Sequence, residues 1–218
     1  MEINTRFGVV VVRPVAALAK AELLARLHPD EAALAAPWGE LRVRTFVAGR
    51  LALREAIALV GGAVDGPLLR AARGAPLVGD HLRASVTHKD TVVAALASTD
   101  VNAGFVGIDV ELFPGPKDDV ASHVLTEVER GELALLDVDA RRRALITRFS
   151  LKEALYKALD PFVQRYVGFL EVEARAHDDG TASFALALHK GEGPFVVDGA
   201  HQPVDGGVLT FARVSRRP

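Results

Sequence analysis

The sequence contains no cysteine, and this absence excludes several classes of protein at once. Without thiols there is no disulfide framework, no thiolate nucleophile and no cysteine zinc site. A basic excess is also missing, because 26 Lys and Arg residues face 28 Asp and Glu residues, a formal net charge of −2. Since binding to nucleic-acid phosphates needs a surplus of positive charge, we expect no nucleic-acid partner.

Long apolar runs are absent as well. No stretch reaches the roughly 18 apolar residues that a membrane span needs. The first residues, MEINTRFGVVVVRP, lack the charged start, long apolar stretch and cleavage site of a signal peptide. We therefore expect a cytoplasmic protein with no membrane span. The 218 residues, 50% of them hydrophobic, predict a folded protein of one domain or two small ones.

The chain does contain an alternation of helix-like and strand-like segments. Apolar residues at helical spacing predict helices at Ala16–Leu27, Glu40–Val60 and about Thr126–Leu159, the last broken near Asp137–Asp139 and closed by Asp160-Pro161. Apolar and β-branched runs predict strands at Phe7–Val12, Ala84–Thr87, Thr91–Ser98, Phe105–Leu112, Gly168–Ala176, Ala182–His189, Phe195–Asp198 and Gly207–Val214. Loops are expected at Asp65–Asp80 and Pro114–Asp119. With a seam near residues 99–104, the pattern predicts an α+β protein of two comparable halves, 1–103 and 104–218.

The segment Gly107-Ile-Asp109-Val-Glu111 puts two carboxylates on one face of a predicted strand, because side chains alternate along a strand. Gly107, on the same face, leaves room for another group to approach the sheet. One interpretation is a site for a hard cation, since Mg²⁺ takes one or two carboxylates together with substrate phosphate oxygens. The other is a solvated strand face. Both interpretations are open at this point.

The segment Arg148–Leu159 is rich in strong helix formers, and Phe149, Glu153 and Lys157 recur every four residues on one face. A functional interpretation makes Glu153 a third metal ligand or a general base, and Lys157 a cation that contacts phosphate. Two structural interpretations compete with it. Ser150 and Glu153 match a capping box, although the helical pattern already begins upstream, and Glu153 with Lys157 matches an ion pair worth about 0.2–0.5 kcal/mol.

Phosphate-binding side chains also occur in the first half of the chain. Ser85, His88 and Lys89 gather a hydroxyl, an imidazole and an ammonium at the end of a predicted strand, where they could bind phosphate or form a polar hairpin connection. Arg50 and Arg54, one helical turn apart, could hold a phosphate or lie in solvent. G-x-G-x-x-G after a strand, Walker A and G-x-S-x-G patterns are all absent, which argues against a dinucleotide-binding site, an ordinary nucleotide-triphosphate site and a serine hydrolase.

The order and spacing of these segments resemble the 4′-phosphopantetheinyl transferase superfamily. G-I-D-V-E is followed, 42 residues after Glu111, by Glu153 in F-S-L-K-E-A-L-Y-K, and upstream the chain has F-x-x-G-R-x-x-x-R from Phe46 to Arg54. Arg73-Gly-Ala-Pro76, leading to Ser85-Val-Thr-His88-Lys89, resembles the coenzyme A segment of the surfactin- and enterobactin-synthetase-activating branch. The length resembles the longer type, in which two halves form a pseudo-twofold α+β fold in one monomeric chain.

The resemblance implies transfer of the 4′-phosphopantetheine arm of coenzyme A (CoA) to a serine of an apo acyl, aryl or peptidyl carrier, with release of 3′,5′-ADP. Such carriers belong to polyketide synthases and nonribosomal peptide synthetases, among other pathways. It assigns the N-terminal half to the nucleotide end of CoA and the C-terminal half to the metal and the chemistry. By this resemblance Mg²⁺ is held by Asp109, Glu111 and Glu153; catalysis uses Glu153, Lys157 and Asp109; and CoA is bound by Arg44, Arg50, Arg73, Ser85, His88, Lys89 and Lys157.

Three departures from the family pattern bear on these expectations. Phe149 stands where the family usually has Trp, and Thr87 replaces a more frequent Ser. Ala75 stands where many members have a basic residue, and Arg73 or Arg70 could supply that charge. The segment Phe113–Leu136 corresponds to one that helps dock the carrier in relatives, so Val124, Leu125 or Leu133 is expected to contribute an apolar contact to the carrier.

Two other functions are compatible with parts of the pattern. A non-catalytic protein binding CoA or acyl-CoA on the same scaffold would need neither the base Glu153 nor Lys157 for binding alone. A metal-dependent phosphodiesterase would also use clustered carboxylates, but no basic surface is available for a polymer.

Overall fold

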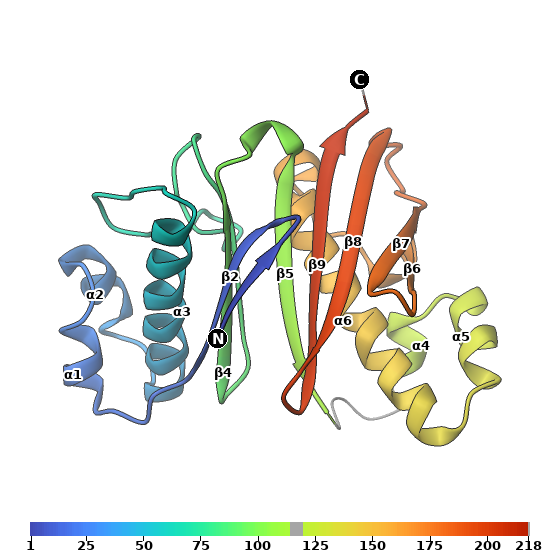
Figure 1. Cartoon of the computed structure of the whole chain (residues 1–218), viewed down its shortest axis with the longest axis horizontal. Helices are drawn as coiled ribbons and strands as arrows, with labels where there is room; N and C mark the ends of the chain where they lie inside the picture. Colours follow the sequence, from blue (N-terminus) through green and yellow to red (C-terminus); the bar gives the residue numbers. More distant parts are fainter. Residues whose placement is uncertain (114–119, 218) are drawn as a thin grey trace. The chain divides into compact units, whose positions relative to one another are not determined.

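A computed structural model describes residues 1–113 and 120–217, so the predicted loop Pro114–Asp119 lies outside the described residues (Figure 1). The chain divides into two compact units, Met1–Asn102 and Ala103–Pro218. We call them the N-terminal unit and the C-terminal unit. Each contains an antiparallel sheet and one long helix packed against it, which confirms the α+β class.

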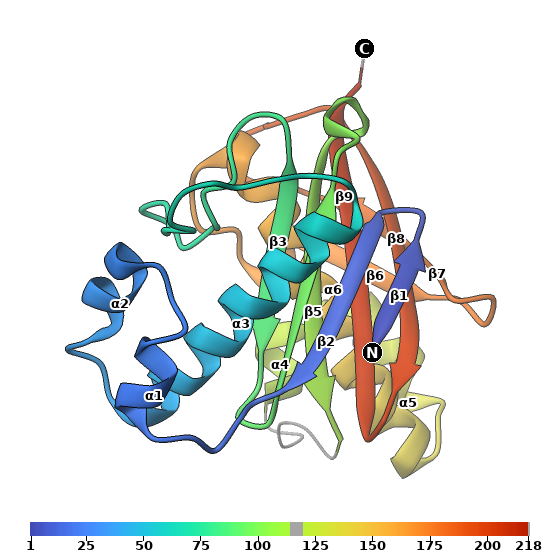
Figure 2. The same cartoon turned by 60° about the vertical axis from the view of Figure 1, so that its left-hand side comes forward.

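The N-terminal unit is built around helix α3 (Glu40–Leu59), which packs on a sheet of order β1-β2-β4-β3. Apolar side chains of α3, of β2 and of β4 form the core between them, because both elements present a continuous apolar face there. Figure 2 shows the two short helices α1 and α2 on the side of α3 away from the sheet. The remaining elements are β1 (Glu2–Thr5), β2 (Gly8–Pro14), α1 (Lys20–Leu24), α2 (Pro29–Ala35), β3 (Arg83–His88) and β4 (Val92–Ser98).

The C-terminal unit places the 26-residue helix α6 (Val138–Val163) against a sheet of order β5-β9-β8-β7-β6. Helix α6 makes its most extensive contacts with β5 and β9, and α4 and α5 lie beside α6 (Figure 1). The other elements are β5 (Phe105–Leu112), α4 (Ala121–Val124), α5 (Glu127–Ala134), β6 (Val172–Ala176), β7 (Thr181–Leu186), β8 (Phe195–Val204) and β9 (Gly207–Arg216), with 3₁₀ turns at Val101–Ala103 and Phe169–Glu171.

The helix predicted over Ala16–Leu27 is wrong in extent, since α1 covers five residues and a separate helix α2 follows it. The second helix begins at Pro29 because His28 caps it. The His28 ring accepts a hydrogen bond from the Asp30 backbone, and the Glu31 carboxylate accepts one from the His28 backbone N–H. This is a capping box, with a histidine in the position that usually holds Ser or Thr.

The predicted end of the long helix at Asp160-Pro161 is also wrong, because α6 continues to Val163 with Pro161 inside it. A proline lacks the N–H that would bond four residues back, but in the last turn this removes only one hydrogen bond. The predicted break near Asp137 is confirmed, since Asp137 caps the start of α6 and accepts a hydrogen bond from the Ala140 backbone N–H at 2.8 Å.

The remaining helix and strand predictions are largely confirmed, with ends displaced by a few residues. Strand β1 was not predicted, and β8 extends six residues beyond the predicted Phe195–Asp198. Within the described ranges, no helix is both long enough and apolar enough to cross a membrane.

Candidate active site

Strand β5 and helix α6 of the C-terminal unit approach each other most closely at Gly107. A Cβ at this position would overlap the carbonyl oxygen of Ala154 and lie 3.0 Å from the backbone nitrogen of Ala158. The group that approaches the strand at Gly107 is therefore α6 itself. The side chains that follow on this strand face, Asp109 and Glu111, are only 5% and 4% exposed. The interpretation of this face as a solvated one is wrong.

The Asp109 carboxylate is held between two side chains of α6. Its Oδ2 accepts a hydrogen bond from Ser150 Oγ at 2.8 Å, and its Oδ1 accepts one from Lys157 Nζ at 2.8 Å. Ser150 Oγ also lies 2.9 Å from Thr210 Oγ1 on the neighbouring strand β9, and Lys157 Nζ donates to the Ile108 carbonyl at 2.8 Å. Both oxygens of Asp109 thus have a defined partner, one neutral and one positively charged.

Glu153 projects from the same side of α6 as the two residues that contact Asp109. It follows Ser150 by three residues and precedes Lys157 by four, spacings that place all three side chains on one helical face. Ser150 lies in the middle of α6, which begins at Val138, so the capping-box interpretation is wrong. Lys157 donates hydrogen bonds across to β5, to the Ile108 carbonyl and to Asp109.

The predicted three-carboxylate metal site is not assembled in the structure. Among the residues that the structure describes, no group of three or more His, Cys, Asp or Glu side chains is arranged to hold a metal ion. What the fold does bring together is Asp109 and Glu111 on β5, and Ser150, Glu153 and Lys157 on the facing side of α6.

A second cation of α6, Lys152, is completely buried and was not singled out from the sequence. Its Nζ donates to Glu129 Oε2 at 2.6 Å and to the carbonyls of Val124 at 2.8 Å and Phe169 at 3.0 Å. Burial lowers the pKa of Lys152, and Glu129 opposes this shift. Glu129 is itself 2% exposed and also accepts from the Ala174 backbone N–H. Lys152 therefore ties α6 to α4, to α5 and to the 3₁₀ turn at Phe169–Glu171, and Glu129 extends the connection to β6.

The three apolar residues expected to contact a carrier are core residues instead. Val124, Leu125 and Leu133 are 3%, 1% and 3% exposed and pack with Leu145 in one cluster under α5. That expectation is wrong, because a side chain this deeply buried offers no surface to a partner. Among the described residues of the same segment, the large apolar side chains that are exposed are Val128, Leu135 and Leu136.

The N-terminal unit contains a cavity of about 160 Å³ between α3 and the loop that precedes β3. Two of the residues predicted to bind CoA, Arg50 and His88, line it. Burial lowers the pKa of Arg50 to about 10, which Glu31 partly offsets and Arg70 and Arg54 reinforce. Arg50 is 4% exposed, and its buried Nε and Nη2 have no hydrogen-bond partner among the described residues. The full lining is Trp38, Arg42, Thr45, Phe46, Gly49, Arg50, Arg70, Gly74, Val86 and His88.

Two aromatic rings support the guanidinium groups of this cavity. The guanidinium carbons of Arg42 and Arg70 lie 4.2 Å and 4.9 Å from the Trp38 ring centroid, and that of Arg50 lies 4.5 Å from the Phe46 ring centroid. The two rings meet edge to face at 5.0 Å. A guanidinium that stacks on an aromatic ring keeps its N–H groups, which lie in its own plane, available to an anion at its edge.

Sequence reasoning missed Trp38 and Arg42, and it left the choice between Arg70 and Arg73 open. One signal was available, because Arg42, Phe46 and Arg50 recur every four residues along one face of α3. Trp38 and Arg70 join them from other segments, and no local pattern indicates that. His88 is the last residue of β3, opposite Val93 of β4, so the β3–β4 hairpin is confirmed.

Four residues of the N-terminal unit that were predicted to bind CoA do not line this cavity. Arg44 forms an ion pair with Glu40 at 3.4 Å on another side of α3, and Arg73 is exposed in the preceding loop. Ser85 is buried on the strand face opposite to that of His88, because neighbouring side chains of β3 alternate. Lys89 lies in the hairpin turn. Arg54 is structural, since it forms an ion pair with the buried Glu31 at 2.5 Å.

Comparison with protein families identifies the class to which the chain belongs. Residues 105–212 match the 4′-phosphopantetheinyl transferase superfamily, and residues 30–98 match the 4′-phosphopantetheinyl transferase N-terminal domain. The chain is a member of this superfamily, of the longer type that contains both parts, and it is a transferase.

Two curated relatives support the same assignment. The chain is 31% identical over 200 residues to the 4′-phosphopantetheinyl transferase Npt of Nocardia iowensis, covering 85% of this chain and 88% of the relative. It is 32% identical over 169 residues to the 4′-phosphopantetheinyl transferase Svp of Streptomyces mobaraensis, covering 76% and 67%.

Solved structures of smaller enzymes match about half of the chain. A holo-(acyl-carrier-protein) synthase from Bacillus anthracis in complex with CoA (3′,5′-ADP) matches with 22% identity and a TM-score of 0.44, covering 53% of this chain and 97% of that one. The holo-[acyl-carrier-protein] synthase of Thermotoga maritima matches with 27% identity and a TM-score of 0.43, covering 53% and 64%.

Proposed function

We propose that this transferase moves the 4′-phosphopantetheine arm of CoA onto a serine hydroxyl of an apo carrier protein and releases 3′,5′-ADP. One observation carries the proposal. The Asp109 carboxylate lies between Ser150 and Lys157 of α6, the helix whose same face bears Glu153. Carboxylates and an ammonium on facing elements suit phosphoryl transfer, in which the protein mainly positions groups and stabilises charge.

We further propose that the reaction depends on Mg²⁺, and the donor set fits this ion. Asp109 and Glu111 offer hard oxygen ligands from one strand face, and Mg²⁺ takes one or two protein carboxylates and completes its shell with waters and substrate phosphate oxygens. A cation already binds at this point, because the Lys157 ammonium contacts Asp109 Oδ1. When bound, Mg²⁺ would supply positive charge against the diphosphate oxygens of CoA.

The side chains of the site support a single in-line transfer. The carrier serine oxygen forms a bond to the phosphorus nearer the pantetheine, and the bond from that phosphorus to the oxygen bridging to 3′,5′-ADP breaks. The serine proton passes to the Glu153 carboxylate, which acts as the general base directly or through one water. Lys157 neutralises the charge that develops on the phosphate oxygens.

The cavity of the N-terminal unit is the proposed site for the nucleotide end of CoA. Its lining includes Arg42, Arg50 and Arg70, and no carboxylate. A phosphate in contact with Arg50 would supply the hydrogen-bond acceptors that its buried Nε and Nη2 lack. Arg70 belongs to this lining and Arg73 does not, so we assign to Arg70 the positive charge missing at Ala75.

The transfer is tested by intact-mass spectrometry with CoA, Mg²⁺ and a panel of apo acyl, aryl and peptidyl carriers. We expect a carrier to gain the mass of one phosphopantetheine while 3′,5′-ADP appears. Asp109→Asn and Glu153→Gln should abolish this gain with an unchanged circular dichroism spectrum. Glu55→Gln makes the same chemical change on α3 and should keep at least half of the activity. Full activity of Asp109→Asn or of Glu153→Gln would refute the mechanism. If no carrier in the panel gains mass and CoA is not consumed, the non-catalytic alternative is favoured.

The nucleotide site is tested separately by calorimetric titration with 3′,5′-ADP. Arg70→Ala and Arg50→Met should weaken binding by about tenfold or more, the range of one to two lost charge-assisted hydrogen bonds. Arg73→Ala and Arg44→Ala are matched controls outside the cavity and should stay within twofold of the parent. If Arg73→Ala weakens binding and Arg70→Ala does not, the assignment of the cavity is wrong.

A further inference from the structure

The two oxygens of Asp109 are bound by groups that differ greatly in burial. Oδ2 accepts from Ser150, whose side chain is fully buried and whose hydroxyl also contacts Thr210 on β9 at 2.9 Å. Oδ1 accepts from Lys157, whose side chain is 30% exposed at the end of a long flexible stem. The serine cannot withdraw without opening the core, whereas the lysine can leave through its exposed side.

The Lys157 ammonium is bound by oxygen atoms that the chain itself supplies, as a bound metal cation would be. Its Nζ lies 2.8 Å from a carboxylate oxygen and 2.8 Å from the Ile108 carbonyl oxygen. Both are oxygen donors of the type that Mg²⁺ prefers. A divalent ion and an ammonium bound to the same Asp109 oxygen repel each other, so the binding of one disfavours the binding of the other.

We propose that Lys157 is an exchangeable counter-ion: it holds Asp109 while no divalent ion is bound, and Mg²⁺ must displace it to bind. The displaced ammonium is then free to contact substrate phosphate. This inference rests on the magnesium dependence within the proposed function. It makes Lys157 a competitor of the metal, opposite to the usual expectation that removing a neighbour of a metal ligand weakens the site.

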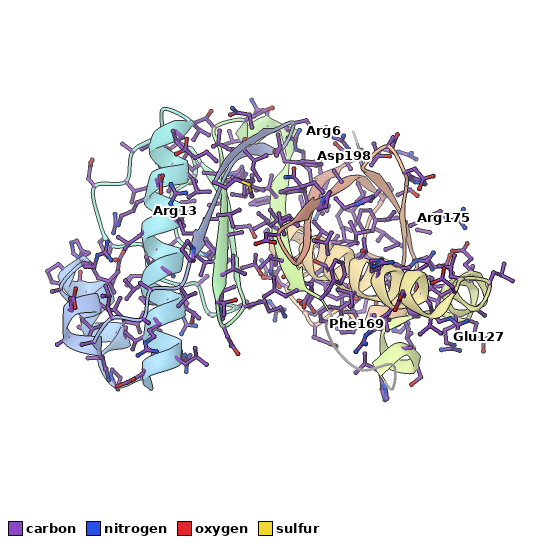
Figure 3. The ribbon with its side chains drawn as sticks, turned by 60° about the horizontal axis from the view of Figure 1, so that its bottom comes forward. Arg6, Arg13, Glu127, Phe169, Arg175 and Asp198 are labelled. Carbon is purple, nitrogen blue, oxygen red and sulfur yellow. The ribbon has the colours of Figure 1, made fainter. Side chains whose placement is uncertain are left out.

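A corresponding ion pair without a second acid on its strand face provides the control. In the N-terminal unit, Arg13 of β2 pairs with Glu55 of α3, and Figure 3 shows Arg13 directed toward that helix. Two residues beyond Arg13 on the same side of the chain stands Val15, where the C-terminal unit has Glu111 two residues beyond Asp109. Breaking this pair should affect stability alone.

The first experiment titrates Mg²⁺ alone into Lys157→Met, Glu55→Gln and the parent enzyme, and follows heat and melting temperature. Loss of a competing ion pair worth up to about 1 kcal/mol should tighten Mg²⁺ binding to Lys157→Met by about three- to fivefold. Its melting temperature should fall without Mg²⁺ and rise more with it. Glu55→Gln should bind Mg²⁺ within 1.5-fold of the parent. Equal or weaker Mg²⁺ binding by Lys157→Met would overturn the proposal.

A second experiment uses the unaltered chain and does not depend on how any variant folds. The sequence has six lysines, so acetylation by a hydroxysuccinimide ester can be followed residue by residue with peptide mass spectrometry. Mg²⁺ should raise the labelling rate of Lys157 several-fold. The exposed Lys190 should not change, and the fully buried Lys152 should stay unlabelled in both conditions. An unchanged or lower rate at Lys157, up to 50 mM Mg²⁺, would overturn the proposal.

Neither experiment contains CoA or a carrier, so its outcome is separate from that of the transfer assay. If the enzyme modifies no carrier but Mg²⁺ releases Lys157, the exchange stands and the proposed transfer fails. If the enzyme modifies carriers and Lys157 is not released, the transfer stands and the exchange is wrong.

Discussion

The N-terminal and C-terminal units use the same pairing of a strand with a long helix. Only the C-terminal unit has two acidic residues, Asp109 and Glu111, on the strand face that meets the helix. In each, a glycine with positive φ stands at the start of the strand: Gly8, at 137°, is the first residue of β2, and Gly104, at 113°, immediately precedes β5. A Cβ at either glycine would overlap a carbonyl oxygen of the neighbouring strand, that of Ala97 or of Val214. From these glycines onward, the two antiparallel strand pairs have the same register: Val9 lies opposite Ala97, and Phe105 lies opposite Val214.

The helices correspond as well. The core residues of α3 recur in the same order on α6, where alanine, leucine, alanine and an aliphatic residue face the sheet. Counting from these anchors gives a residue-by-residue correspondence. The pairs are Val11 with Gly107, Arg13 with Asp109, Val15 with Glu111, Arg50 with Lys152, Ala52 with Ala154, Glu55 with Lys157 and Ala56 with Ala158.

The strand–helix ion pair keeps its place in the two units and reverses its polarity. Arg13 of β2 pairs with Glu55 of α3, and Asp109 of β5 pairs with Lys157 of α6. The scaffold therefore tolerates either sign at this position. A cation site requires the acid on the strand, where a second carboxylate two residues on shares its face, and the C-terminal unit alone has this arrangement at these corresponding positions.

The helix cations Arg50 and Lys152 differ in what compensates their burial. Lys152 is bonded to Glu129 and two carbonyls, whereas Arg50 has two buried nitrogens without a partner among the described residues. A buried charge needs compensation, from the protein or from a ligand. We conclude that Lys152 is a structural cation and that Arg50 belongs to a binding site.

The largest expected effect comes from breaking the buried Lys152–Glu129 pair, the structural member of this comparison. Glu129→Gln leaves the Lys152 ammonium buried without its carboxylate, which costs about 3–5 kcal/mol of folding free energy. Chemical denaturation followed by circular dichroism should show this loss. Arg50→Met removes a buried charge that no carboxylate pairs with, so its stability should equal or exceed that of the parent. Equal losses in the two variants would remove the distinction between structural and binding cations.

The second effect separates the core of α5 from its surface. Leu133→Ala empties part of a buried cluster and should cost about 2–5 kcal/mol, because a cavity adds to the lost apolar transfer. Leu135 is 89% exposed, so Leu135→Ala should change stability by less than about 0.5 kcal/mol. Thermal denaturation of the two variants measures both. A stable Leu133→Ala variant with a raised KM for carrier would restore Leu133 as a docking residue.

The third effect concerns the closer approach of strand and helix in the C-terminal unit. Gly107→Ala forces the new methyl group against the Ala154 carbonyl, so β5 and α6 must move apart at a cost of about 1–3 kcal/mol. The same movement pulls Asp109 away from Ser150 and Lys157. We expect a greater loss of kcat than of CoA affinity. At the corresponding position of the N-terminal unit, Val11→Ala should leave kcat unchanged although it lowers stability.

The smallest effect is a pH dependence that belongs to the C-terminal unit. The Arg165 guanidinium, with N–H groups of His189 and Gly168, lowers the pKa of the buried Glu171 to about 2. The unfolded chain, in which this carboxyl has its ordinary pKa near 4.5, binds more protons, so stability is lost as pH falls from about 4.5 toward 2.

We expect this carboxyl to contribute a loss of about 1 kcal/mol, or about 2–4 °C in melting temperature, between pH 5.5 and about 3.8. Arg165→Gln should be less stable at neutral pH and should lose less on acidification. Scanning calorimetry across this range checks both. A variant with the acid sensitivity of the parent would show that other carboxylates dominate.

The sequence predicted the elements that carry the site because their signals are local. Alternation along Phe105–Leu112 placed Asp109 and Glu111 on one face, and the four-residue spacing of α6 placed Glu153 beside Lys157. It failed where a contact joins distant segments. Nothing near Lys157 indicates that it bonds to Asp109, 48 residues earlier, and nothing near Trp38 indicates that Arg70 stacks on it.

The chain alone therefore determined the alternation of helices and strands, the absence of cysteine chemistry and the resemblance of its motifs to a transferase family. The tertiary structure decided which charges are buried and what each one contacts: Lys152 in a structural pair, Arg50 at a cavity, and Asp109 between a buried hydroxyl and a partly exposed ammonium. The physical reason is that hydrophobic periodicity is a property of neighbouring residues. The energy of a buried charge depends on partners that only the folded chain brings within hydrogen-bonding distance.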